Sequence, residues 1–218
     1  MKISCVIPAY NEAKKIKLVI EKVLPLVDEL IVVDDCSRDN TLELIKQTKA
    51  IAISHIINRG QGAALQTGSQ YALSHGADII VHFDADDQFK AEEIETLITP
   101  IKNGQADAVF GSRFLGSANF PYTKRKIIMP LARLINRLFG IKMSDPQSGF
   151  RALNKETLAQ IKIENRGMAH CSEILYKTFK TKARIIEVPI NVVYHEFGQS
   201  FGGGFKIIKD LLIHKFIK

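Results

Sequence analysis

The chain has few cysteines and no long apolar run, and each shortage argues against a class of protein. Its three cysteines are scattered, odd in number and without a CxxC pair, so neither a zinc ribbon nor a disulfide scaffold fits. No apolar run reaches the roughly 18 to 20 residues that a membrane-spanning helix needs. With 14 glycines and 7 prolines in 218 residues, the chain is not collagen-like. Its 46% hydrophobic content predicts a single globular domain over residues 1–218.

The two ends of the chain bear on where the protein works. The apolar stretch over residues 3–8 is too short for a signal peptide. Residues 205–218 place Phe, Ile and Leu at helical spacing among lysines, which is typical of a helix in the headgroup region of a membrane. Packing on the sheet or against a second copy of the chain is the alternative. We expect a cytoplasmic protein, peripheral on the cytoplasmic membrane face, with a membrane-protein partner or a homodimer left open.

Negative charge is scarce in one segment. Residues 113–151 hold eight basic residues and one acidic residue, so this segment carries +7, the net charge of the whole chain. A concentrated basic patch predicts an anionic partner such as a phosphate, a nucleic acid or an acidic lipid. A solvated basic face is the plainer interpretation.

Short apolar runs alternate with helix-period segments through the first half of the chain. Helices are expected between the strands, including one over residues 91–98 that ends before Pro100. Pro189 predicts an edge strand over residues 185–194. The alternation predicts an α/β fold with a mostly parallel sheet and helices on both faces. We expect strands over residues 3–8, 30–33, 52–57, 79–83 and 108–110.

Asp84 and Asp86 directly follow the strand expected over residues 79–83. Side chains two residues apart on an extended chain point the same way, and close carboxylates repel each other unless a cation lies between them. Oxygen ligands favour Mg²⁺ or Mn²⁺ over zinc, and Gln88 adds a neutral oxygen. The alternative is an acidic turn in which Asp87 caps the next helix.

Polar groups also follow the first three predicted strands. Tyr10 and Glu12 suit stacking and hydrogen bonding of a base, and Asp34 and Asp35 suit a base N–H or a ribose hydroxyl. Helix capping explains the same residues without a ligand. Residues 58–65 are not a dinucleotide fingerprint, because Leu65 occupies the third glycine position. Small residues at this helix start still permit close approach of a nucleotide.

Two short motifs each place an arginine in the basic segment. Arg113 ends Gly-Ser-Arg and Arg151 ends Ser-Gly-Phe-Arg. Arginine binds phosphate through two parallel hydrogen bonds. A solvated arginine is the alternative at each position.

Six motifs in order resemble the family 2 glycosyltransferases, and within them the dolichol- and polyprenol-phosphate sugar synthase branch. They are PAYNE (8–12), VVDDCS (32–37), NRGQGAA (58–64), DADDQ (84–88), GSR (111–113) and SGFR (148–151). The resemblance implies a GT-A fold, a nucleotide-sugar donor bound by residues 1–112 and an acceptor bound by residues 113–218. Cys36 replaces a glycine that is frequent in the family, and residues 198–201 lack a lysine that is frequent there.

The resemblance also assigns roles to residues. It implies that Asp84, Asp86 and Gln88 hold Mg²⁺ or Mn²⁺. It implies a nucleotide pocket of Pro8, Tyr10, Glu12 and Asp35 with Asp34 nearby, to which we add Arg59, Gly62, Asp84, Ala85 and Asp86.

The acceptor decides which catalytic groups the reaction needs. A lipid phosphate is largely ionised at neutral pH, so an inverting transfer needs no general base. Arg113, Arg151 and either Lys124 or Arg125 would then position it, with Asp86 acting through the metal. A sugar hydroxyl of a cell-surface glycan needs a base, and Asp87 and Glu173 are the candidates. The basic segment favours the phosphate acceptor.

Three other functions fit less well. A nucleotidyltransferase would need a basic, glycine-rich loop after the first strand, which residues 8–12 do not provide. A nucleic-acid-binding protein would need neither PAYNE nor DADDQ, so we expect no nucleic-acid partner. A binder without catalysis would not need both of the metal-binding carboxylates, Asp84 and Asp86.

Overall fold

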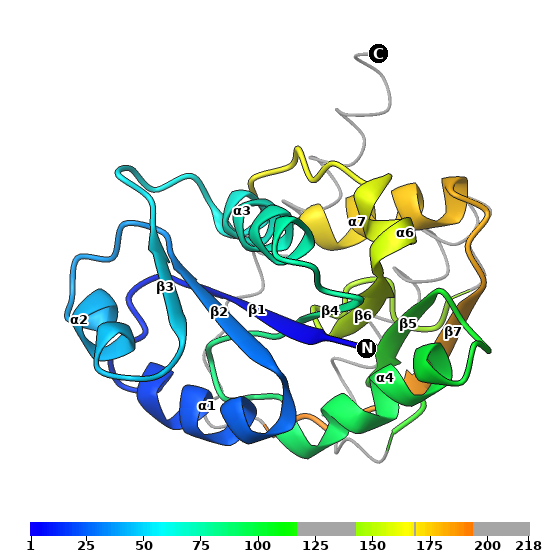
Figure 1. Cartoon of the computed structure of the whole chain (residues 1–218), viewed down its shortest axis with the longest axis horizontal. Helices are drawn as coiled ribbons and strands as arrows, with labels where there is room; N and C mark the ends of the chain where they lie inside the picture. Colours follow the sequence, from blue (N-terminus) through cyan, green and yellow to red (C-terminus); the bar gives the residue numbers. More distant parts are fainter. Residues whose placement is uncertain (117–142, 168, 194–218) are drawn as a thin grey trace, which may run out of the picture.

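A seven-stranded sheet runs through the centre of the computed structural model, which describes residues 1–116, 143–167 and 169–193 (Figure 1). Its order is β3-β2-β1-β4-β6-β5-β7, and β6 is antiparallel to both of its neighbours while the other pairs are parallel. The predicted mostly parallel sheet is therefore confirmed. The strands are β1 (Ile3–Ala9), β2 (Glu29–Asp34), β3 (Ile51–Ser54), β4 (Ile79–His82), β5 (Ala108–Ser112), β6 (Arg151–Asn154) and β7 (Ile185–Pro189).

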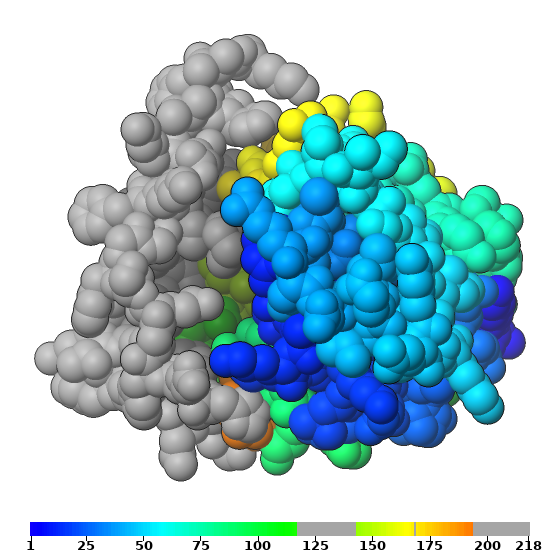
Figure 2. Space-filling model, turned by 90° about the vertical axis from the view of Figure 1, so that its left-hand side faces the viewer, coloured from blue at the N-terminus to red at the C-terminus, as the bar shows by residue number. Residues whose placement is uncertain are grey.

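Helices cover both faces of this sheet, as predicted. Helices α1 and α4 pack on one face and α3, α6 and α7 on the other (Figure 1). Figure 2 views the molecule from the side of α2 and the edge strand β3. The helical segments are α1 (Ile16–Val23), η1 (Leu24–Leu26), α2 (Thr41–Lys46), α3 (Gln61–Ser74), η2 (Ala91–Glu93), α4 (Ile94–Lys102), α6 (Lys155–Ala159) and α7 (His170–Lys180).

Strand β1 explains why polar side chains gather at one edge of the sheet. All seven of its residues are buried, as expected for a parallel strand covered on both faces. It pairs in parallel with β2 on one side and β4 on the other, with Ala9 beside Asp34 and Val6 beside His82. The segments that leave β1, β2 and β4 therefore start from one edge, where ligands bind in open α/β sheets.

Several predicted boundaries change in the structure. Pro100 lies inside α4, because the buried stripe of Leu97, Ile98 and Ile101 continues past it and packing offsets the lost hydrogen bond. Strand β3 ends at Ser54 rather than at residue 57. Strand β6 and helix α6 were not predicted, because four residues give too short a periodic signal. The edge position of β7, which carries Pro189, is confirmed.

Parts of the predicted acceptor half lie outside the described residues. These are Lys124, Arg125, a helix expected over residues 127–139, residues 198–201 and the helix expected over residues 205–218. Within the described part, no helix is both long enough and apolar enough to cross a bilayer. Strands from both predicted halves, residues 1–112 and 113–218, join in the one sheet.

Candidate functional site

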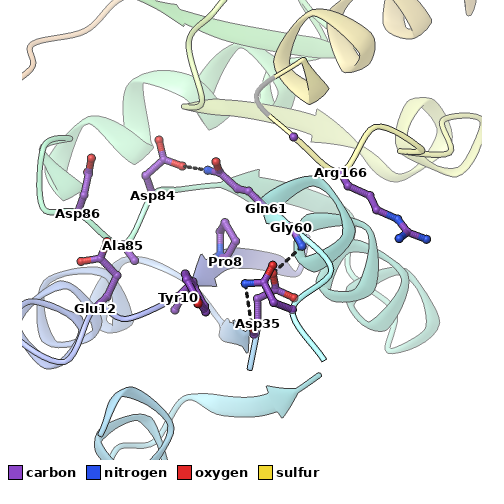
Figure 3. Close-up of a pocket in the computed structure, with 13 residues that line it drawn as sticks. Pro8, Tyr10, Glu12, Asp35, Gly60, Gln61, Asp84, Ala85, Asp86 and Arg166 are labelled. Atoms are coloured by element: carbon purple, nitrogen blue, oxygen red, sulfur yellow. Dashed lines mark hydrogen bonds between the residues drawn. The ribbon is translucent and has the colours of Figure 1, made fainter. Parts of the chain in front are cut away.

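The polar segments after β1, β2 and β4 enclose one cavity of about 510 Å³ (Figure 3). Loops from distant parts of the sequence complete it. Seven of the predicted donor-binding residues line it, namely Pro8, Tyr10, Glu12, Asp35, Asp84, Ala85 and Asp86. Its other lining residues are Ala9, Asn58, Gly60, Gln61, Arg166 and Gly167.

The predicted metal-binding carboxylates share this cavity with a third acid. Burial and the neighbouring charge of Asp86 raise the pKa of Asp84 to about 7. Burial also raises the pKa of Asp86, and burial together with the charge of Asp86 raises that of Glu12. Gln61, the first residue of α3, donates a hydrogen bond of 2.9 Å from its Nε2 atom to Oδ1 of Asp84 (Figure 3). The three acids thus concentrate negative charge that a cation would relieve.

The donor set fits a hard divalent cation rather than a protein cage for zinc. Within residues 1–116, 143–167 and 169–193, no three His, Cys, Asp or Glu side chains are grouped to hold a metal ion. Mg²⁺ and Mn²⁺ accept one or two carboxylates when substrate phosphates and water fill the other positions. Asp84 and Asp86 meet that requirement, because both carboxylates line the cavity.

Gln88 and Asp87 lie differently from these two carboxylates. The backbone N–H of Gln88 donates to Oδ1 of Asp86 at 3.1 Å, and Gln88 is not a lining residue of the cavity. Asp87 has a positive φ of 56° and forms an ion pair of 2.6 Å with Lys22. Asp87 is also not among the lining residues. Their roles as metal ligand and general base stay predictions.

Asp35 anchors the loop on the other side of the cavity. It is 3% exposed, and it accepts hydrogen bonds from the backbone N–H groups of Arg59 at 2.8 Å and Gly60 at 2.6 Å. Gly60 has a φ of 90°, a backbone conformation that residues with a side chain rarely adopt. A side chain on Gly62 would collide with the backbone oxygen of Asn165, so this glycine permits close packing of two loops.

Asp34 and Arg59 are predicted donor-binding residues that do not line the cavity. Oδ2 of Asp34 accepts from the backbone N–H of Ser37 at 3.2 Å and from the Ser54 hydroxyl at 3.4 Å. This carboxylate therefore shapes the turn after β2. Arg59 contributes its backbone N–H to Asp35.

The two predicted phosphate-binding arginines each have partners within the protein. Arg113 forms a bidentate ion pair with Asp145, with distances of 2.6 and 2.7 Å, and Asp145 is 1% exposed. Arg151 is 0% exposed and donates to the backbone oxygen of Gly149 at 3.2 Å and to Sγ of Cys171 at 3.4 Å. An acceptor would reach Arg151 only if covering residues moved.

Cys171 lies next to this buried arginine. Burial opposes ionisation, but the charges of His170 and Arg151 lower the pKa of its thiol to about 6. The Arg151 guanidinium lies at hydrogen-bond distance from Sγ of Cys171. The thiolate form of Cys171 would balance its charge in the protein interior, where an unpaired cation is costly.

Glu173 holds a cavity loop, although it was predicted as a general base. Its carboxylate accepts from the backbone N–H groups of Glu164 at 3.1 Å and Asn165 at 2.8 Å, and it forms an ion pair of 2.7 Å with Lys177. The loop that it holds presents Arg166 to the cavity. Its role as a base stays a prediction.

Six lining residues of the cavity were not assigned from the sequence, namely Ala9, Asn58, Gly60, Gln61, Arg166 and Gly167. Asn58, Gly60 and Gln61 lie within the NRGQGAA motif, so the motif signalled the right segment. Arg166 belongs to a loop without a recognisable motif, and only the fold places its backbone against Gly60 (Figure 3).

Known proteins resemble this chain over almost its whole length. Its sequence is 37% identical to a UDP-N-acetylglucosamine–dolichyl-phosphate N-acetylglucosaminyltransferase of Methanococcus voltae, over 96% of this chain and 94% of the relative. An undecaprenyl-phosphate mannosyltransferase of Micrococcus luteus is 32% identical over 92% of this chain and 87% of the relative.

A solved structure shows the same architecture. Glucosyl-3-phosphoglycerate synthase from Mycobacterium tuberculosis, in complex with uridine diphosphate, superposes with a TM-score of 0.76 at 26% identity. The match covers 97% of this chain and 79% of that one. The same enzyme in complex with Mn²⁺ and UDP-glucose gives 0.77 at 25% identity, over 97% and 78% of the two chains. The predicted GT-A fold is confirmed.

One protein-family model matches residues 4–162, from the second residue of β1 to beyond the end of β6. The match includes all the cavity residues except Arg166 and Gly167. Together with the relatives above, this match shows that the chain belongs to glycosyl transferase family 2.

Proposed function

We propose that the protein transfers a sugar, with inversion, from a nucleotide-sugar donor to a polyprenyl or dolichyl phosphate. One observation carries the proposal: the paired carboxylates Asp84 and Asp86 share a cavity with the anchored carboxylate Asp35. The pair Asp84 and Asp86 suits a diphosphate bound through a cation, and Asp35 suits a nucleoside. The relatives named for dolichyl- and undecaprenyl-phosphate transfer support the lipid acceptor.

Asp84 and Asp86 would hold Mg²⁺ or Mn²⁺, and Gln88, two residues after Asp86, would be a further ligand. When bound, the cation neutralises the charge that develops on the departing nucleoside diphosphate. Gln61 orients Asp84 through the hydrogen bond from its amide. Arg166 adds a positive charge to the cavity lining.

The nucleoside would occupy the side of the cavity formed by Pro8, Tyr10 and Asp35. Tyr10 is 40% exposed at this edge, so its ring is accessible for stacking on a base. Asp35 accepts hydrogen bonds from a nucleoside while the backbone of Arg59 and Gly60 keeps it in place.

The acceptor oxygen attacks the anomeric carbon from the face opposite the diphosphate. A bond to the acceptor phosphate forms as the bond to the nucleoside diphosphate breaks, so the configuration inverts. An ionised phosphate needs no base, which agrees with the ion pairs of Asp87 with Lys22 and of Glu173 with Lys177. We propose that this reaction takes place at a membrane surface on the cytoplasmic side.

The test is sugar transfer by the purified full chain from a panel of UDP- and GDP-sugars. Each donor is combined with Mg²⁺ or Mn²⁺, with and without a short polyprenyl phosphate. Transfer that requires both cation and lipid is expected, and Asp86→Asn should lower it at least about 100-fold. Glu95→Gln, on the exposed side of α4, is the matched control and should transfer normally.

Two results would contradict the proposal. Donor binding with transfer only to sugar hydroxyls would assign the family's other acceptor class and return attention to Asp87 and Glu173. Failure to bind any nucleotide sugar, with binding to duplex DNA that weakens as salt rises, would replace the enzyme by a basic nucleic-acid-binding protein.

A further inference from the structure

His55 follows the last residue of β3 and connects two elements on the nucleoside side of the cavity. Its side chain is buried between β2 and α3, and the whole residue is 9% exposed. Nδ1 lies 2.7 Å from Oδ1 of Asp35, and Nε2 lies 2.9 Å from the hydroxyl of Thr67 in α3. Its backbone N–H donates to the backbone oxygen of Asp34 at 2.9 Å. The ring therefore spans the gap between the strand end and the helix.

The hydrogen bonds of Thr67 determine how many protons the ring carries. The Thr67 hydroxyl donates its single hydrogen to the backbone oxygen of Ala63, one helical turn earlier, at 3.0 Å. It therefore accepts from His55, so Nε2 carries a hydrogen. Nδ1 faces a carboxylate oxygen, which also only accepts. With hydrogens on both nitrogens, the ring is an imidazolium cation.

The ion pair adds a charged contact to an already anchored carboxylate. Oδ1 of Asp35 accepts from His55 and from the backbone N–H of Arg59, while Oδ2 accepts from Gly60. Hydrogen bonds between two charged groups are stronger than those between neutral ones. His55 thus fixes the direction of the Asp35 carboxylate and, through it, the backbone of the loop at Arg59 and Gly60.

We propose that His55, as an imidazolium, is a positioning residue that holds Asp35 in the orientation that binds the nucleoside of the donor. This inference rests on the proposed function, because it assigns Asp35 to the nucleoside.

Few other titratable groups of the described residues face this ring. The last residue of β2, Asp34, has a carboxylate that accepts from Ser54, and Asp35 directly follows this strand. The turn after β2 contributes Cys36, whose thiol donates to the backbone oxygen of Ile56 at 3.4 Å. The loop of His55 itself carries Arg59, and α3 contributes the uncharged Thr67.

Three substitutions of His55 distinguish the hydrogen bond that Nδ1 makes from the one that Nε2 makes. His55→Asn places an amide N–H near the position of Nδ1 and keeps a neutral hydrogen bond to Asp35. His55→Gln places its N–H near Nε2 and keeps only the bond to Thr67. His55→Leu keeps neither. We expect the Kd for UDP or GDP with Mn²⁺ to rise about tenfold or more in His55→Gln and His55→Leu, and clearly less in His55→Asn.

A comparison of Kd with kcat distinguishes a positioning residue from a merely structural one. His75→Asn is the matched control, because His75 is exposed at the end of α3 and its loss should leave the wild-type Kd unchanged. At saturating donor, kcat should stay within about twofold in all three His55 variants, because they alter binding rather than chemistry.

A second measurement tests the ring without any nucleotide. Nitrogen NMR of the unliganded full chain at pH 6.5 should show hydrogens on both ring nitrogens of His55. A neutral ring there would overturn the inference whether or not a nucleotide binds. Equal Kd values for His55→Asn and His55→Gln would also overturn it. A wild type that binds neither UDP nor GDP would instead contradict the proposed function.

Discussion

Gly149 leaves just enough room for the carboxylate of Asp84. A methyl group at Gly149 would lie 2.5 Å from Oδ2 of Asp84, closer than real Cβ contacts come. Gly149 belongs to the Ser-Gly-Phe-Arg segment at the start of β6, so the antiparallel strand brings this glycine next to the candidate metal ligand.

Gly149→Ala should displace Asp84 and weaken cation binding. We expect the Mn²⁺ concentration for half-maximal transfer to rise about tenfold, since a misplaced ligand costs roughly 1.4 kcal/mol or more. The control is Gly68→Ala in α3, where a methyl would collide with Val6 of β1 instead. That variant should lose thermal stability while its Mn²⁺ requirement stays unchanged. An unaltered Mn²⁺ requirement in Gly149→Ala would contradict the assignment of Asp84.

Asp84→Asn should stabilise the protein at high pH in the absence of divalent cations. The pKa of Asp84 rises from 3.8 to about 7 on folding, so its contribution to stability is fully present below pH 3.8 and is lost as the pH rises through about 7. The asparagine removes this loss. The variant should melt about 5 °C above the wild type at pH 8.5, and the difference should vanish near pH 4.

Two controls accompany this measurement. Asp107 has its pKa lowered to about 2, chiefly by the hydrogen bond from Arg184, so Asp107→Asn should change stability at pH 8.5 in the opposite direction. Added Mn²⁺ should raise the Tm of the wild type and leave that of Asp84→Asn unchanged. A lower Tm for Asp84→Asn at pH 8.5 would show that Asp84 is not strained by burial.

Glu173→Gln tests whether this residue is a base or a loop anchor. If its carboxylate only holds the backbone at Glu164 and Asn165, we expect the KM for the donor to rise about five- to tenfold while kcat and its pH profile persist. Lys177→Met keeps both backbone bonds and should have a smaller effect. A loss of kcat of about 100-fold, together with loss of the fall in kcat at low pH, would show that Glu173 is the general base.

Arg151→Met tests whether the buried arginine acts mainly on stability. Its removal takes away one of the two charges that lower the pKa of the Cys171 thiol, and breaking a buried charged pair typically costs about 3 to 5 kcal/mol. We expect a Tm drop of about 10 °C. Arg184→Met, which loses a surface ion pair with Asp107, should change the Tm little. A normal Tm with a raised KM for the lipid alone would instead confirm the predicted acceptor contact.

The sequence was most informative where a strand led directly into a polar motif. The apolar runs before Asp35 and Asp84 predicted both the strands and the shared edge, because parallel strands bring their carboxyl ends together. The same reasoning failed at Asp34, since side chains alternate along a strand and one of two adjacent aspartates must face away from the cavity.

Partners distant in sequence could not be predicted in this way. Arg113 was expected to bind a phosphate, but Asp145 lies 32 residues away and nothing in either motif signals the pairing. Glu173 and Arg166 depend likewise on how α7 packs against the loop before it. The Asp35–His55 pair combines two residues that are 20 positions apart, and His55 lies outside every motif recognised in the sequence.

The reversed strand β6 also limits how the protein can be divided. β4 has β1 and β6 as its neighbours, and β5 touches the rest of the sheet only through β6 and β7. A fragment that ended at Ser112 would expose the full edge of β4 and leave β5 with no strand to pair with. The donor-binding half is therefore not a detachable module: cutting the chain between β5 and β6 should yield two pieces that fold only when they are recombined.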